Sequence, residues 1–184
     1  MTIDVTSVED NPTSSARTVT TAEDTAYSFS SADFAFADGD SGDTLQQIVI
    51  DAAPSQGTLK LDGTAVDFSG GAVVVAASDL SKLSFEPDAE ANGTGYTSFD
   101  YKVVDQAGNE SSATALTINV TAVNDAPAAQ PLTVSTAEDT DYSFSSADFA
   151  FADADSSDSI KGIEIQAAPS TGTLKLNGTD FDIT

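Results

Sequence analysis

The sequence predicts an all-β sandwich of two packed sheets, repeated along the chain. Three observations indicate it. The segments "TLKL" (58–61), "SFDYKVVD" (98–105) and "ALTINV" (115–120) alternate apolar and polar residues with the period of two that a half-buried strand shows. Short clusters of Gly, Pro, Asn, Asp and Ser separate the strand-like segments, as turns do. A long stretch of the pattern also recurs later in the chain, which is the signature of tandem units.

Taken in chain order, the elements of one unit are almost all strands. "LQQIVIDA" (45–52) and "AVVVAA" (72–77) are rich in β-branched residues and predict two more strands. Only "AASDLSKL" (76–83) indicates a helical turn, with Ser78 as its N-cap.

The strand at 98–105 indicates which side of the sheet meets the core. Phe99, Tyr101 and Val103 point one way, while the polar residues between them point the other way. Seven or so short strands in about 110 residues are typical of an immunoglobulin-like sandwich. We expect the alternating Phe, Ile, Leu and Val side chains to form its core.

The chain contains an internal repeat. Residues 22–67 and 137–182 match at 33 of 46 positions, with a shift of 137 − 22 = 115 residues. "VTSVEDNP" (5–12) aligns with "VTAVNDAP" (120–127) at the same shift. We therefore expect an excerpt from a longer tandem array. Its predicted parts are the last strand and linker of a preceding repeat (1–11), a complete repeat (12–122), a linker (123–127) and the N-terminal half of a truncated second repeat (128–184).

The charge of the chain restricts its partners. Thirty acidic residues oppose six basic ones, which gives a formal net charge of −24 at pH 7. The basic residues are scattered singly, so no basic patch is present to bind nucleic acid or an anionic membrane. No apolar run is long enough for a membrane helix. We expect a cation as the small partner, and a merely soluble or halophilic surface is the alternative explanation.

The acidic residues gather at four places, and two of these, "AED" and "DGDSGD", recur in the second copy. The first copy has "AED" (22–24), "DGDSGD" (38–43) and "VVD" (103–105), and the linker has "VNDAP" (123–127). Two carboxylates in D-x-D spacing on extended backbone point the same way, so both can reach one ion. Ca²⁺ binds roughly six to eight oxygens of this kind, and it turns the repulsion between neighbouring carboxylates into attraction.

Two common calcium motifs do not fit this pattern. An EF-hand loop that starts at Asp38 would have Gly42 at its fifth position and Val49 at its twelfth, and neither is a side-chain ligand. The nonapeptide G-G-x-G-x-D of parallel β-helices is absent from the sequence.

The ordered set of "VNDAP", "AEDT", "ADGDSGD" and "FDYKVVDQAG" resembles cadherin-type repeats. It is most similar to the bacterial cadherin-like (tandem-95, VCBS-related) repeats of large RTX-type surface adhesins. Their short helical turn, F-x-P, N-G and D-x-x-G turn are matched by "SDLSKLSFEPDAEANGTGYTSFDYKVVDQAGN". The resemblance covers the whole chain and implies a Greek-key, cadherin-like sandwich that binds calcium (Ca2+) at the junctions between repeats.

The resemblance also implies the calcium ligands. Carried over residue by residue, the upstream junction uses Glu9, Asp10, Asp38, Asp40 and Asp105. The junction between the two copies uses Glu23, Asn124, Asp125, Asp153 and Asp155. Asp24 and Asp43 receive no role in this assignment.

The function that the resemblance implies is a calcium-rigidified spacer or adhesion segment of a large bacterial cell-surface or secreted adhesin, located outside the cell. Its expected partners are calcium ions, neighbouring repeats of the same chain, and a polysaccharide or cell-surface ligand. The alternative is a carbohydrate-binding module of a polysaccharide-associated extracellular protein, for which Tyr96 is the aromatic residue expected to be exposed. The sequence has no His and no Cys, the usual base and thiol nucleophile, so we expect no enzyme.

Overall fold

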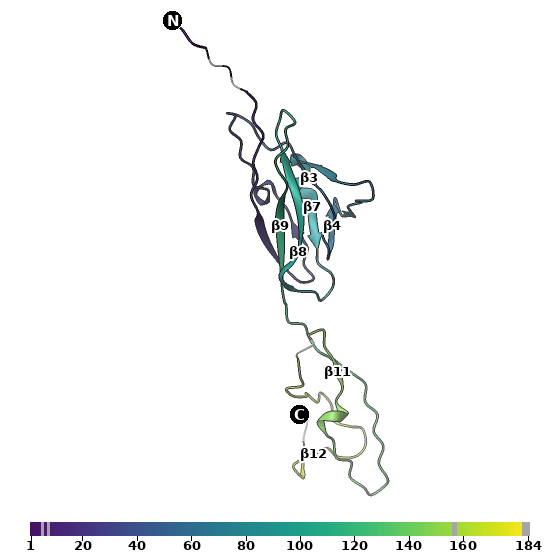
Figure 1. The fold of residues 1–184 in the computed structure, drawn as a ribbon. Coiled ribbons are helices and arrows are strands. Elements are labelled where there is room, and N and C mark those ends of the chain that lie inside the picture. The colour runs from purple at the N-terminus through teal and green to yellow at the C-terminus, as the bar shows by residue number, and fades with distance from the viewer. Residues whose placement is uncertain (5, 7, 156–157, 182–184) are drawn as a thin grey trace. The chain divides into compact units, whose positions relative to one another are not determined.

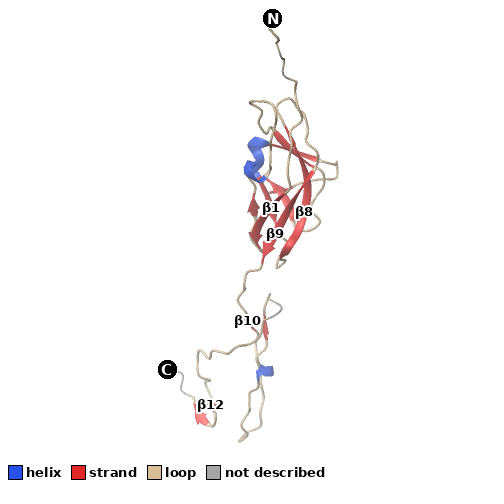
Figure 2. Cartoon of the chain, turned by 60° about the vertical axis from the view of Figure 1, so that its left-hand side comes forward, coloured by secondary structure: helices blue, strands red, loops and turns tan. Residues whose placement is uncertain are grey.

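The structure, a computed structural model, describes residues 1–4, 6, 8–155 and 158–181. It divides into two units, Met1–Val123 (unit 1) and Asn124–Thr184 (unit 2), and each is described by itself. Most strand structure belongs to unit 1, whereas the described residues of unit 2 are largely loops (Figure 1; Figure 2).

The described residues of unit 1 form two sheets around one core. The five-stranded sheet has the order β1 (Arg17–Ala22), β9 (Thr114–Thr121), β8 (Gly93–Val104), β3 (Gln47–Ile50) and β6 (Val73–Ala76). The four-stranded sheet has the order β2 (Tyr27–Ser28), β7 (Leu83–Glu86), β4 (Thr58–Leu61) and β5 (Thr64–Ala65). β1 and β9 run parallel, and the other neighbouring strands of these two sheets run antiparallel.

The core lies between the two sheets, and β8 supplies its centre. Phe99, Tyr101 and Val103 of β8 are buried, as their alternation with polar residues predicts. The ring of Tyr101 packs edge-on against Phe34, with 5.1 Å between the ring centroids. Phe85 is buried in the same cluster from the opposite sheet. Burying each such side chain stabilises the folded state by about 1.5–3 kcal/mol. The predicted all-β immunoglobulin-like sandwich is confirmed.

The predicted helical turn is a 3₁₀ helix, η2 (Ala77–Lys82), but its N-cap was predicted wrongly. The N-cap is Ala76, the last residue of β6, and Ser78 lies inside the first turn. Because the chain passes directly from strand to helix, it starts the helix without a side-chain cap. The buried side chain of Leu80 holds the turn against the core.

Unit 2 repeats local structure of unit 1. The 3₁₀ helices η1 (Ser31–Asp33) and η3 (Ser146–Asp148) lie 146 − 31 = 115 residues apart. In η1, Asp33 accepts hydrogen bonds from the Ser30 N–H (2.8 Å) and the Tyr27 O–H (2.9 Å). The residues 115 positions later form the same two bonds around η3. The described strands of unit 2 are β10 (Ala128–Ala129), β11 (Phe151–Ala152), β12 (Lys175–Leu176) and β13 (Thr179–Asp180).

The N-terminal segment lies outside both sheets. Residues 1–4, 6 and 8–12 are in no strand. Val5, which belongs to the strand expected at the end of a preceding repeat, lies outside the described residues. The assignment of 1–11 to a preceding repeat therefore stays a prediction.

Candidate metal centre

Three segments carry the acidic side chains of the predicted upstream junction. They are residues 9–13, the loop 37–46 that leads into β3, and the turn 105–109 that follows β8. Thr13 joins the first two segments, because its N–H donates to the Ala37 carbonyl (2.7 Å) and its carbonyl accepts from the Ala37 N–H (3.0 Å). Short loops that are fixed to a rigid sandwich in this way position polar side chains well.

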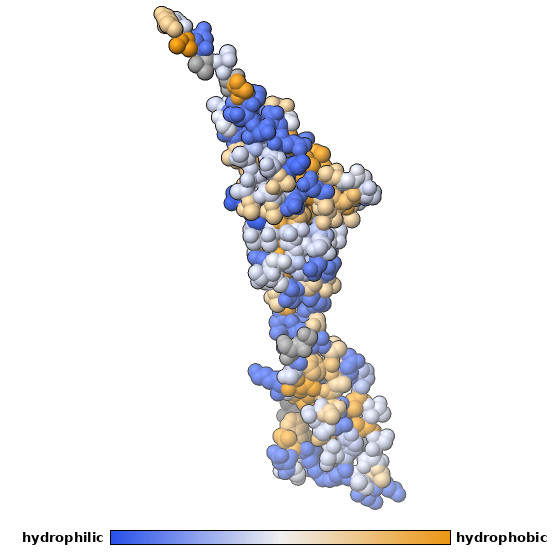
Figure 3. Space-filling model, viewed as in Figure 1, coloured by the Kyte–Doolittle hydropathy of each residue, from blue (hydrophilic) through white to orange (hydrophobic). Residues whose placement is uncertain are grey.

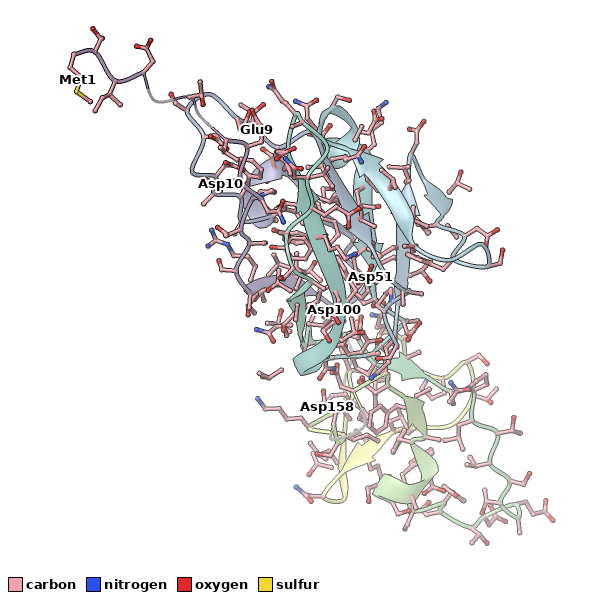
Figure 4. All side chains as sticks on the ribbon, turned by 45° about the horizontal axis from the view of Figure 1, so that its top comes forward. Met1, Glu9, Asp10, Asp51, Asp100 and Asp158 are labelled. Atoms are coloured by element: carbon pink, nitrogen blue, oxygen red, sulfur yellow. The ribbon has the colours of Figure 1, made fainter. Side chains whose placement is uncertain are left out.

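Backbone hydrogen bonds to carboxylates fix the spacing of these acids. The Asp10 N–H donates to Asp40 Oδ2 (2.7 Å), and the Asp40 N–H donates to Asp38 Oδ1 (2.8 Å). Figure 4 shows Glu9 and Asp10 at the end of unit 1 where the N-terminal segment meets the sandwich. The D-x-D segment thus folds as a tight turn, in which the Asp38 carboxylate accepts a hydrogen bond from the backbone N–H two residues later.

The loops bring five acidic residues together in two overlapping groups. One carboxylate oxygen each from Glu9, Asp40 and Asp43 lies within 4.8 Å of the others, and the same holds for Asp38, Asp43 and Asp105. We call these five residues the N-terminal acidic cluster. Oxygens that bind one Ca²⁺ lie about 2.3–2.6 Å from the ion and hence at most about 5 Å from one another. Both groups therefore have the spacing of a calcium ligand set, and Asp43 belongs to both.

Two oxygens of the cluster are buried without a hydrogen-bond donor. Within the described residues, no donor reaches Asp38 Oδ2 or Asp43 Oδ2. Asp105 is only 1% exposed, but its two oxygens accept from the backbone N–H of Asn109 (2.8 Å) and from its side-chain amide (2.9 Å). Burying carboxylate oxygens is unfavourable unless a donor or a cation compensates the lost water. These two oxygens therefore need a hydrogen-bond donor or a cation as a partner.

The pKa values of two residues of the cluster are raised. Burial, followed by the charges of Asp38, Asp105 and Asp40, raises the pKa of Asp43 above its ordinary value. The charges of Asp40 and Asp43 are the main reason that the pKa of Glu9 is raised.

Asp105 behaves in the opposite way. Burial alone would raise its pKa, but the hydrogen bonds from Asn109 and from the N–H groups of Gly108 and Ala107 outweigh burial and lower the pKa. Asp105 thus stays ionised beside the carboxylates of Asp38 and Asp43. The ionised carboxylate is the form that can bind a cation.

Four of the five lysines form ion pairs away from the cluster. Four ion pairs join lysines to carboxylates outside the cluster: Lys60–Glu86, Lys82–Asp79, Lys102–Glu110 and Lys175–Asp141. Figure 3 shows hydrophilic side chains gathered over the part of unit 1 next to the N-terminal segment. A small, hard divalent cation is the partner whose chemistry fits this arrangement.

Unit 2 contains the same acidic turn. The Asp125 N–H donates to Asp155 Oδ2 (2.7 Å), and the Asp155 N–H donates to Asp153 Oδ1 (3.0 Å). One oxygen each of Asp153, Asp155 and Asp158 lies within 4.8 Å of the others. Asn124 occupies the position of Glu9, and its side-chain amide donates to the Asp125 carbonyl (2.7 Å). The turn forms in the same way in both units because the sequence repeats with a shift of 115.

Glu23 lies at the other end of unit 1 and has nitrogen donors as partners. Its carboxylate accepts from the Asn92 side-chain amide (2.7 Å) and from the Val123 N–H (2.6 Å). These two hydrogen bonds lower the pKa of Glu23, although the residue is buried. Glu23 therefore fixes the segment that leaves β9. Its predicted role as a calcium ligand together with residues of unit 2 stays a prediction.

Most of the predicted upstream ligands lie in the cluster. The structure brings together four of the five: Glu9, Asp38, Asp40 and Asp105. Asp10 contributes its backbone N–H to the turn. Asp43, which received no role from the sequence, is the residue common to both groups. The signal that identifies it is the spacing D-x-D-x-x-D, which recurs at the same shift with Asp158 as the equivalent of Asp43.

The expectation that Tyr96 is exposed is wrong. Tyr96 is buried, and its O–H donates to Asp88 Oδ2 (2.9 Å). A bulge between Gly93 and Thr97 turns this side chain toward the core. The carbohydrate-binding alternative therefore loses the aromatic platform on which it rested.

Unit 1 is thus an immunoglobulin-like sandwich module with an acidic cluster on its loops. The family model described as "Bacterial Ig domain" matches residues 9–119, which is more than half of the chain, so the chain belongs to this family. No match was found among curated proteins or among solved structures. Domains of this family are typically non-catalytic structural modules, and they commonly occur as repeats in surface proteins. In the part of the chain that the structure describes, no helix is long and apolar enough to cross a membrane.

Proposed function

We propose that this chain is a calcium-binding, cadherin-like spacer segment of a large bacterial surface adhesin. The observation that carries the proposal is the pair of buried oxygens, Asp38 Oδ2 and Asp43 Oδ2, which no donor in the described residues satisfies and which lie beside the ionised Asp105. A divalent cation is the simplest group that compensates all three carboxylates at once.

The N-terminal acidic cluster would supply the protein ligands. Glu9, Asp40 and Asp43 form one group and Asp38, Asp43 and Asp105 the other, so the cluster offers a second position for an ion beside the first. Backbone carbonyls and water would complete the coordination shell of Ca²⁺. The ion would cross-link residues 9–13, the loop before β3 and the turn after β8.

The proposal extends to unit 2 through the repeat. Asp153, Asp155 and Asp158 form the same turn, and Asn124 and Asp125 precede it as Glu9 and Asp10 precede the turn in unit 1. Cross-linking at each repeat would restrict the motion of successive sandwiches and neutralise part of the net charge of −24. A secreted protein meets enough calcium to fill sites of modest affinity, which suits the surface proteins in which this family commonly occurs.

Calorimetric titration of the full chain with Ca²⁺, alone and as matched variants, tests the proposal. We expect saturable binding, and we expect Asp43→Asn to weaken it about tenfold or more because both groups lose their common carboxylate. Asp62→Asn is the matched control, since Asp62 is an exposed turn residue and the second copy carries Asn177 at the equivalent position. An absence of binding at millimolar Ca²⁺, or equal effects of the two substitutions, would contradict the proposal.

A further inference from the structure

Three residues of unit 1 hold the backbone that follows β9. The side-chain amide of Asn92, directly before β8, donates to Glu23 Oε2 (2.7 Å). The other oxygen of Glu23 accepts the N–H of Val123 (2.6 Å), the last residue of unit 1. Glu23 is only 4% exposed. We call Glu23, Asn92 and Val123 the exit clamp.

The exit clamp requires an amide at position 92. An ionised carboxylate can only accept hydrogen bonds, so both partners of Glu23 must be donors. The hydrogen bond from Asn92 is the main reason that the pKa of Glu23 is lowered, and it outweighs burial. Glu23 is therefore ionised at neutral pH, and a second acceptor at position 92 would be repelled.

Asn92 is followed by a glycine, which makes its amide chemically reactive. Asn92 is exposed, and Gly93 has no Cβ that would obstruct ring closure. A Cβ built on Gly93 would contact no described atom within 4 Å, so the space beside this backbone is open. The residues thus meet the steric requirements for attack of a backbone nitrogen on a side-chain amide.

The reaction needs water as its only co-reactant. The Gly93 backbone nitrogen loses its proton to water and forms a bond to Asn92 Cγ. The bond from Cγ to Nδ2 then breaks, and the leaving nitrogen takes a proton from water and departs as ammonia. A second water opens the cyclic imide to aspartate or to isoaspartate, so that the amide has become an acid.

We propose that Asn92 is a site of spontaneous deamidation and that its conversion to a carboxylate opens the exit clamp. In the aspartate product, an oxygen with negative charge replaces the donor that lies 2.7 Å from Glu23 Oε2. Two ionised carboxylates at this distance in a largely buried place repel each other strongly. In the isoaspartate product, an extra methylene enters the backbone directly before β8 and displaces the same group. Either product separates Glu23 from its partners and frees the Val123 N–H.

A second Asn–Gly pair in the chain serves as an internal control. Asn177 and Gly178 lie in the turn between β12 and β13, and Asn177 is exposed. Its equivalent in unit 1 is Asp62, and both residues have a φ of 51°. Deamidation of Asn177 therefore produces the residue that the same turn of unit 1 already carries. The contact with Glu23 is what makes the consequence at Asn92 different.

Ageing of the full chain at mildly alkaline pH tests the proposal, in calcium-free buffer because the inference does not depend on calcium. Peptide mapping by mass spectrometry should find aspartate and isoaspartate at position 92. Amide exchange measured by NMR should be at least about tenfold faster at Val123 in the deamidated fraction. Asn92→Asp should reproduce this change, and Asn177→Asp should not. An Asn92 that remains an amide, or that reacts while the exchange of Val123 stays the same, overturns the proposal.

A double variant separates charge repulsion from a general loss of structure. Glu23→Gln combined with Asn92→Asp exchanges the donor and the acceptor of the bond and leaves one oxygen to accept the Val123 N–H. We expect Val123 exchange to return toward the wild-type rate, while the backbone amide of the buried Tyr101 stays protected throughout. A double variant whose Val123 exchanges as fast as in Asn92→Asp alone overturns the proposal, because repulsion is then not the cause.

Discussion

The carboxylate of Asp43 is the point at which both acidic groups of unit 1 meet. Its pKa is raised chiefly by burial and then by Asp38, Asp105 and Asp40, so the ionised form opposes folding when no cation is present. Under the proposed calcium binding, the same residue would be the ligand that both groups share. One side chain would therefore change from a source of repulsion to a cross-link.

The first prediction follows from this change of sign. In calcium-free buffer with EGTA, Asp43→Asn should raise the Tm of unit 1, because the variant removes a buried charge and its amide can donate to Asp38 Oδ2. In saturating calcium the same variant should lower the Tm. Scanning calorimetry measures both, with Asp62→Asn as the control that changes neither. A variant that is less stable than the wild type in EGTA would contradict the account.

The second prediction concerns pH in calcium-free buffer. A carboxyl group with a raised pKa in the folded state favours folding below that pKa and opposes folding above it. Because the pKa values of Glu9 and Asp43 are raised from 4.5 and 3.8, stability should increase as the pH falls from about 7 toward the range just above these values.

At lower pH the effect should reverse. The pKa values of Glu23 and Asp105 are lowered, and their contribution is lost as the pH falls through their folded-state pKa values. Urea midpoints from about pH 7 to 3 measure the profile. A stability that decreases steadily from neutral pH, with no rise, would show that the acidic cluster does not repel itself.

Tyr101 joins three elements through its hydroxyl. The hydroxyl donates to the Ser15 carbonyl (3.3 Å) and accepts from Ser14 Oγ (3.1 Å) and from the Ala35 N–H (3.2 Å). It thus holds the segment before β1 and the loop after η1 against β8. The acidic residues on the neighbouring segments depend on this arrangement for their spacing.

The third prediction tests this connection. Tyr101→Phe should lower the stability of unit 1 by about 1–3 kcal/mol, because it leaves the Ala35 N–H without its acceptor inside the fold. Tyr27→Phe is the matched control, since the half-buried Tyr27 loses only its bond to Asp33. Denaturant unfolding compares the two. Equal losses in the free energy of unfolding would mean that the Tyr101 hydroxyl stabilises unit 1 no more than the Tyr27 hydroxyl does.

Gly57, directly before β4, lies close to the Phe85 ring of β7, and this gives the fourth prediction. A Cβ at Gly57 would clash with Phe85 Cζ, and it would lie 2.6 Å from Phe85 Cε2 and 2.8 Å from the Glu86 carbonyl. Gly63, in the turn between β4 and β5, has a similar positive φ but open space around it.

Gly57→Ala should therefore be much more destabilising than Gly63→Ala. We expect about 1–2 kcal/mol for Gly63→Ala, which reports the backbone conformation alone, and about 3 kcal/mol or more for Gly57→Ala. Chemical denaturation of both variants gives the comparison. If the two losses agree, the ring of Phe85 does not approach the backbone as described.

At the level of elements, the sequence was informative where the pattern is local. Strand β4 has the predicted bounds, and the inward face of β8 follows from simple alternation. Tyr96 was misplaced because a bulge between Gly93 and Thr97 interrupts that alternation. A bulge depends on how two strands pair, and the glycines around it predict only a turn from the sequence.

The candidate site was partly predictable for the same reason. The D-x-D spacing identifies Asp38 and Asp40 from the sequence alone. The position of Asp43 depends on how its loop folds against the turn after β8, which no local pattern records. The partners of Glu23 depend on the parallel pairing of β1 with β9, which brings its carboxylate to the Val123 N–H.

For the whole molecule, the distribution of charge is more informative than its total. Four lysines pair with acids outside the N-terminal acidic cluster, and none of these four ion pairs includes a residue of the cluster. The repeat places an equivalent acidic turn in unit 2. If the proposed calcium binding holds, a tandem array of such units would carry a regular series of cation sites, and its stiffness would depend on the surrounding calcium concentration.

The fifth prediction tests the central claim most directly: thermal unfolding of the full chain in calcium against EGTA at matched ionic strength, which removes general screening as a cause. One filled site at about a hundredfold excess over Kd stabilises the folded state by about 2.7 kcal/mol, so we expect the Tm of unit 1 to rise by roughly 5–15 °C. A Tm that is the same in both buffers would contradict the calcium-binding account.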